Sequence, residues 1–201
     1  MKYFKVLVVV LLLLFAGAFP AEALGRSASK RSSKHKSSHT TLVRFSAVDE
    51  GVYRGSKPKT DADFRLLRSK GVKTIVNLQF LPLLDWREKD AAKKHGIEYI
   101  TVSMNGSPVE PSEKHVAEVL TLLRDGRRHS IYFHCALGRD RTSLIAALYK
   151  VYFLGMSQRD GWRYMKNTGF KDSWNLRGLK SYYFKHPRPP ASLIAFGQTS
   201  R

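Results

Sequence analysis

Short β-prone runs alternate with amphipathic stretches from residue 42 to about residue 184, and this alternation limits the chain to few architectures. Strands separated by helices favour an α/β fold with a central, mostly parallel sheet and helices on both of its faces. A buried helix stripe is expected at Val116, Val119, Leu120 and Leu123. We expect strands at 72–78, 98–102 and 131–133, helices at 61–68, 86–94, 142–153 and 176–184, and two more helices opened by Pro111-Ser112-Glu113 and by Ser157.

The two ends of the chain differ from this central region. Residues 1–23 combine Lys2 and Lys5, an apolar run and an A-x-A site at Ala23, which is typical of a signal peptide and predicts a periplasmic or secreted protein. The alternative is a membrane anchor, but the apolar run is shorter than the roughly 20 residues that span a bilayer. We expect a basic, Ser-rich linker at 24–41, a single domain at 42–186 and a Pro-rich, irregular tail at 187–201. The linker is either a solvated spacer or a weak contact to anionic surfaces.

The composition is strongly basic, with 35 Lys and Arg against 16 Asp and Glu and a net charge of +19. An apolar share of 43% excludes a wholly disordered chain. The single cysteine excludes an intrachain disulfide, and no Cys/His cluster predicts a zinc site. The charge predicts an anionic partner: nucleic acid, an acidic membrane or a phosphorylated substrate.

The segment from Ile131 to Thr142 carries the chemistry. A strand ends at Cys135, a tight loop follows, and a helix begins near Arg141. Such a loop can turn its backbone N–H groups inward to bind an anion, and this setting lowers the pKa of a cysteine. Arg141 can grip two phosphate oxygens, and the Thr142 hydroxyl can hydrogen-bond the thiolate.

These residues resemble the signature of the cysteine-dependent protein tyrosine phosphatase superfamily, His134-Cys135-x5-Arg141-Thr142. The layout over about residues 42–170, including residues 52–58 and 73–78, is similar to that of small atypical dual-specificity phosphatases. The resemblance implies attack by the Cys135 thiolate on a phosphate monoester and a phosphocysteine intermediate, with no metal or organic cofactor. It implies a supporting role for His134. It also implies substrate binding by the loop residues Ala136, Leu137, Gly138, Arg139 and Arg141.

The chain departs from that pattern at the general acid. Family members carry an Asp on a loop upstream of the cysteine, whereas residues 102–108 contain no carboxylate. Asp140, inside the phosphate loop, is the first substitute; the alternative is that it braces the loop by pairing with Arg139. Glu110 is the second substitute.

The expected substrate is a phosphorylated anion. Arg139 lies where phosphatases of phosphoinositides and inositol polyphosphates often carry a lysine, so a phytase-like enzyme acting on inositol polyphosphates, or on phosphoinositides, is favoured over one acting on phosphotyrosine peptides. A catalytically inactive, basic binding module is a further hypothesis. Nucleic-acid binding is not expected, because Trp162, Tyr164 and Trp174 are predicted to pack against helices rather than bind bases.

Overall fold

The computed structural model describes residues 39–80, 85–106, 108–128, 130–191 and 193. These belong to the second of two compact units, Met1–His35 and Lys36–Arg201. The predicted signal peptide, most of the predicted linker and most of the predicted tail lie outside the described residues. No helix among the described residues has the length and hydrophobicity required to cross a bilayer.

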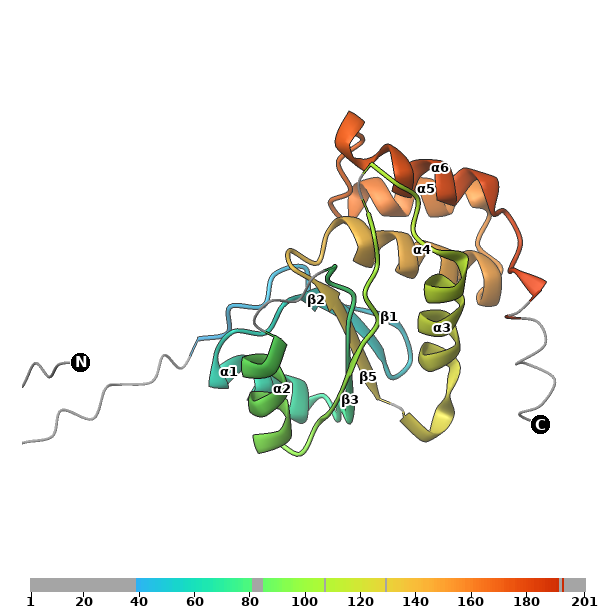
Figure 1. Ribbon diagram of the computed structural model, residues 1–201. Helices are drawn as coiled ribbons and strands as arrows, with labels where there is room; N and C mark the ends of the chain where they lie inside the picture. Colours follow the sequence, from blue (N-terminus) through green and yellow to red (C-terminus); the bar gives the residue numbers. More distant parts are fainter. Residues whose placement is uncertain (1–38, 81–84, 107, 129, 192, 194–201) are drawn as a thin grey trace, which may run out of the picture. The chain divides into compact units, whose positions relative to one another are not determined.

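A five-stranded sheet organises the domain (Figure 1). Its strand order is β1-β2-β5-β3-β4, and all neighbours are parallel except β1 and β2. This arrangement confirms the predicted, mostly parallel sheet. The strands are β1 (Ser46–Asp49), β2 (Val52–Ser56), β3 (Thr74–Asn77), β4 (Glu98–Thr101) and β5 (Ile131–Cys135).

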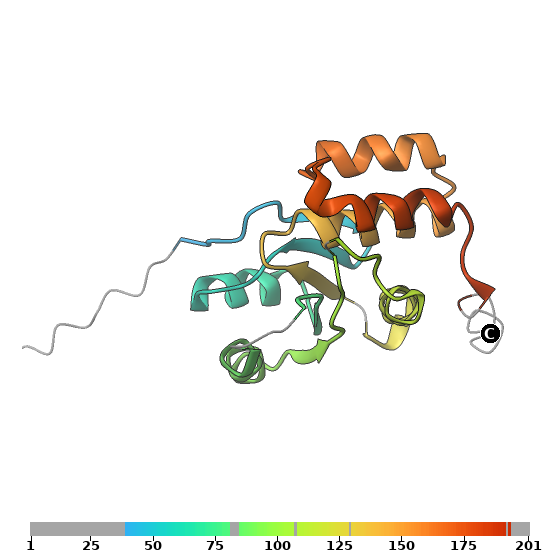
Figure 2. The same cartoon turned by 45° about the horizontal axis from the view of Figure 1, so that its top comes forward.

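Helices cover both faces of the sheet (Figure 2). The helices α1 and α2 lie on one face, where they enclose a smaller core with Tyr132, and α3 to α6 build the larger core on the other face. The predicted stripe of α3 is fully buried. The helices are α1 (Asp61–Ser69), α2 (Asp85–Lys94), α3 (Glu113–Arg124), α4 (Asp140–Phe153), α5 (Gln158–Asn167) and α6 (Arg177–Lys185), with short 3-10 turns at Gly126–Arg128 and Trp174–Leu176.

The position of β5 and α4 follows from their composition. β5 lies between β2 and β3 and is buried at every residue, which suits its apolar sequence. α4 is buried from Thr142 to Tyr149 because the sheet, α3, α5 and α6 surround it. The carboxyl end of a central parallel strand is where α/β proteins place their ligands, and here that end is Cys135.

Two details differ from the sequence-based predictions. α4 begins at Asp140, two residues before the predicted start, so Asp140 lies in its first turn. The packing prediction for Trp174 is wrong, because the residue is 72% exposed. The Arg177 guanidinium carbon lies 4.0 Å from the centroid of its ring. Trp162 and Tyr164 do pack against the larger core, as predicted.

Candidate active site

The loop between β5 and α4 is held in shape by β2. Gly138 has a φ of +63°, which a side chain would strain, and a Cβ there would lie 2.4 Å from the carbonyl carbon of Gly55. Lys57 N–H also donates to the Ala136 carbonyl oxygen at 3.3 Å. Because residue 138 is a glycine, the backbone of the loop can lie in direct contact with the backbone at the end of β2.

Cys135 lies at the base of this loop and is 3% exposed. Its backbone N–H donates to Thr142 Oγ1 at 2.9 Å. Burial raises the pKa of the thiol, but the Thr142 hydroxyl, the backbone amides of Thr142 and Arg139 and the charge of Arg141 outweigh burial. The net pKa lies below the ordinary value of 9.0. The site therefore favours the thiolate.

Arg141 is positioned by the loop that lacks a carboxylate. Its Nε donates to the Met104 carbonyl oxygen at 2.9 Å. A Cβ at Gly106 would lie 2.9 Å from the same Nε, so a side chain there would displace the guanidinium. The segment that lacks the expected acid thus contacts Arg141, the arginine predicted to bind phosphate.

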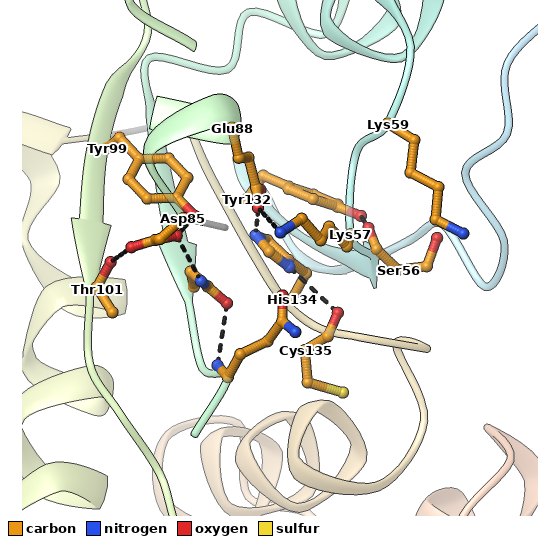
Figure 3. Close-up of polar contacts among 12 residues, drawn as sticks. Ser56, Lys57, Lys59, Asp85, Glu88, Tyr99, Thr101, Tyr132, His134 and Cys135 are labelled. Atoms are coloured by element: carbon orange, nitrogen blue, oxygen red, sulfur yellow. Dashed lines mark hydrogen bonds and ion pairs between the residues drawn. The ribbon is translucent and has the colours of Figure 1, made fainter. Parts of the chain in front are cut away.

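A buried chain of charged groups supports the loop from the α2 side, and sequence reasoning missed two of its members (Figure 3). His134 Nδ1 lies 3.2 Å from the Cys135 carbonyl oxygen, and its Nε2 lies 2.8 Å from Glu88 Oε1. Lys57 Nζ lies 3.2 Å from Glu88 Oε2. These contacts fix the orientation of the His134 ring, and its supporting role in catalysis stays a prediction. The only signal for Lys57 in the sequence is its place in the 52–58 motif.

Asp85 anchors α2, the helix that presents Glu88 (Figure 3). Its carboxylate accepts hydrogen bonds from Tyr99 Oη and Thr101 Oγ1 on β4 and from Asn77 Nδ2 on β3. Partial burial raises the pKa of Asp85, but these hydrogen bonds outweigh it and the net pKa is lowered. The ionised carboxylate thus ties the first turn of α2 to the carboxyl edge of the sheet.

Comparison with known proteins identifies the group to which this arrangement belongs. The sequence profile of the tyrosine phosphatase family matches residues 40–152. The chain belongs to this family. Among curated proteins it is similar to inositol diphosphatase DSP3 of Arabidopsis thaliana, with 31% identity over 139 residues, 67% of this chain and 66% of DSP3. It is also similar to the dual specificity protein phosphatase TpbA of Pseudomonas aeruginosa strain UCBPP-PA14, with 28% identity over 135 residues, 65% of this chain and 57% of TpbA.

The match thus spans less than two thirds of the length of either relative. Among solved structures, the fold resembles the core catalytic domain of the PP-IP phosphatase SIW14 from S. cerevisiae, crystallised with citrate. The TM-score is 0.66 at 18% identity, covering 78% of this chain and 93% of that one. This likeness confirms the predicted dual-specificity phosphatase-like fold.

Asp140, the first candidate for the general acid, contacts residues next to it in the loop and Lys171 after α5. Its carboxylate pairs with Arg139 Nε at 3.2 and 3.1 Å, and the Lys171 N–H donates to it at 3.4 Å. In this arrangement Asp140 braces the loop, and its role as general acid stays a prediction.

Glu110, the second candidate acid, is bound to α6. Its Oε1 accepts hydrogen bonds from Lys185 Nζ and Ser181 Oγ, both at 2.6 Å. The hydrogen bond from Lys185, with that from Ser181, lowers the pKa of Glu110, so the ionised form is favoured. Both candidate acids are paired with a cation. Asp140 remains the first candidate because it lies next to Arg141, at the end of the loop that follows Cys135.

Proposed function

We propose that the protein is a cysteine-dependent phosphatase that hydrolyses phosphate monoesters of inositol polyphosphates. The observation that carries the proposal is the lowered pKa of Cys135 in a preformed anion loop, with Arg141 held beside it. Sγ attacks phosphorus and the ester P–O bond breaks, while the leaving alkoxide takes up a proton. Water then attacks the phosphocysteine, which releases phosphate and restores the thiolate.

Three of the named similarities bear on the substrate. DSP3 is named an inositol diphosphatase and SIW14 a PP-IP phosphatase, whereas TpbA is named a dual specificity protein phosphatase. The net charge of +19 and Arg139 beside the phosphate loop support a substrate with several phosphates. We therefore favour inositol polyphosphates, with phosphoinositides as the lipid counterpart and phosphotyrosine protein as the alternative.

The proposed place of action is the periplasm or the exterior of the cell. This proposal rests on the order of three segments in residues 1–23, which is that of a signal peptide: a basic start, an apolar run and a small-residue cleavage site. The basic residues of 24–41 would add a weak attraction to anionic surfaces. A mature protein that begins at Leu24, identified by N-terminal sequencing of the exported material, is the expected result; retention of Met1 in a membrane fraction would contradict export.

The deciding experiment measures phosphate release by the full chain from inositol hexakisphosphate and a phosphotyrosine peptide side by side. Cys135→Ser is the control and should release none from either. Faster release from inositol hexakisphosphate supports the proposal, and faster release from the peptide replaces it with a protein phosphatase. Release from neither would favour a binding module instead.

A further inference from the structure

A pocket lies beside the phosphate loop, between the segment that enters β1, the strand β2 and the end of α5. Its volume is about 390 Å³. Two of its lining residues are arginines, and no lining residue is acidic. We call it the arginine pocket, and its lining residues are Arg44, Phe45, Ser46, Arg54, Asn167, Thr168 and Gly169.

Arg54 is an incompletely partnered cation in the wall of this pocket. Its side chain is fully buried. Its Nη2 donates to the carbonyl oxygen of Gly138 and, at 3.1 Å, to Ser143 Oγ. Its Nε and Nη1 are shielded from solvent and have no hydrogen-bond partner among the described residues, and no carboxylate among those residues pairs with it. A buried guanidinium without a counter-ion is unfavourable, and an anion in the adjoining pocket would offset part of that cost through its charge.

Two more arginines converge on the same place. Arg44 Nε and Arg139 Cγ lie 2.8 and 3.0 Å from the position that a Cβ would take at Gly169. Arg44 has a φ of 56°, unfavourable for a residue with a side chain, and its Nη1 donates to the Leu137 carbonyl oxygen at 3.2 Å. Of these two, Arg139 has a carboxylate partner, Asp140. The positive charge around the pocket therefore exceeds the negative charge that the described residues supply.

We propose that the arginine pocket binds a phosphate group, distinct from the phosphate that Cys135 attacks. Arginines recognise phosphate through paired N–H donors, and Asn167, which also lines the pocket, carries a neutral amide donor. Arg44 and Arg54 donate to the carbonyl oxygens of Leu137 and Gly138, so the occupant lies next to the catalytic loop. The phosphate is either a second group of the substrate or a separate phosphate ion.

The test uses the full chain carrying Cys135→Ser and Arg141→Met, which disables the loop site. Binding of inorganic phosphate is followed by phosphorus NMR. Saturable one-to-one binding is expected, at least tenfold weaker after Asn167→Asp, which places a carboxylate at the pocket. The matched control is Lys70→Gln at the exposed C-terminal cap of α1, which lowers the net charge by the same unit and should change affinity less than twofold.

Lack of saturable binding in the disabled background, or equal weakening by Asn167→Asp and Lys70→Gln, would overturn the proposal. Arg44→Gln repeats the test without adding a carboxylate, and circular dichroism checks that each variant is folded. Because these measurements need no turnover, they fail independently of the proposed phosphatase activity.

A second arm identifies the source of the phosphate, and it rests on the proposed function. Asn167→Asp is introduced into the catalytically intact chain. A KM raised fivefold or more for inositol hexakisphosphate, but not for 4-nitrophenyl phosphate, assigns the pocket to a second phosphate of the substrate. Unchanged KM values for both, together with phosphate binding in the first arm, assign it to a separate phosphate ion.

Discussion

At Cys135, burial and hydrogen bonding act on the thiol in opposite directions. Burial favours the neutral form, while the Thr142 hydroxyl, two backbone amides and Arg141 favour the thiolate. The Thr142 side chain both donates to the sulfur and accepts the Cys135 N–H at 2.9 Å. Removal of this hydroxyl should therefore shift the balance without changing the charge of the site.

Thr142→Val, nearly isosteric, should raise the pKa of Cys135. The rate of alkylation by iodoacetamide, measured against pH, is expected to reach half its maximum below pH 9.0 in the native chain and at a higher pH in the variant. Thr142→Ser keeps the hydroxyl and should leave the midpoint near the native value. A midpoint that does not move in Thr142→Val would show that the hydroxyl does not stabilise the thiolate.

Asp140→Asn tests whether Asp140 donates the proton to the leaving group or only holds the loop in place by pairing with Arg139. If Asp140 donates the proton, kcat for inositol hexakisphosphate should fall about 10²–10⁴-fold. Release of 4-nitrophenolate should change little, because that leaving group departs without a proton. Glu110→Gln, the matched loss of a carboxylate, should change neither rate. A fall smaller than about threefold on the inositol substrate, far below the range for a general acid, would contradict the acid role.

At the scale of single elements, the start of α1 depends on one buried carboxylate. Asp63 completes a capping box with Thr60 and also accepts hydrogen bonds from Thr40 Oγ1 and Thr41 Oγ1, each at 2.7 Å. Burial raises the pKa of Asp63, but hydrogen bonds, the largest from the Lys59 N–H, lower it well below its ordinary 3.8. Thr40 and Thr41, in the predicted linker, are thereby fastened to the domain.

A carboxylate with a lowered pKa contributes stability above its unfolded pKa and loses that contribution as the pH falls. Asp63→Asn should therefore lower the free energy of unfolding at pH 7 by about 2 kcal/mol, and the difference from the native chain should shrink below about pH 4. Urea unfolding at pH 7 and pH 3 measures it. Asp172→Asn, which removes an exposed pair with Lys180, should cost less than about 1 kcal/mol at either pH. A pH-independent difference for Asp63→Asn would contradict the linkage.

The elements that the sequence predicts best are those with a local cause. The buried run of β5, its end at Cys135 and the following helix can all be recognised within one segment of the chain. Glu88 could not be found in this way, because a single acidic residue in a polar helix is expected to be exposed to solvent. Its contact with His134 exists only once α2 packs against β5. The contact of Arg54 with Gly138 joins residues 84 positions apart, so it depends on the sheet order rather than on any local pattern.

At the scale of the whole molecule, the net charge of +19 should guide multiply charged substrates to the protein. Salt weakens this long-range attraction, since the Debye length falls to about 10 Å at 0.1 M. Between 50 and 300 mM NaCl, we expect KM for inositol hexakisphosphate to rise on the order of tenfold. KM for 4-nitrophenyl phosphate, with a single phosphate, should rise far less. Equal changes in KM for both substrates would show that the positive charge does not attract the multiply phosphorylated substrate specifically.

The contact between Gly138 and the backbone at Gly55 has a thermodynamic consequence. Because the end of β2 presses against the loop, the conformational entropy of residues 136–139 is lost when the chain folds, not when an oxyanion arrives. Vanadate binding should therefore be dominated by enthalpy, with little entropic penalty from ordering.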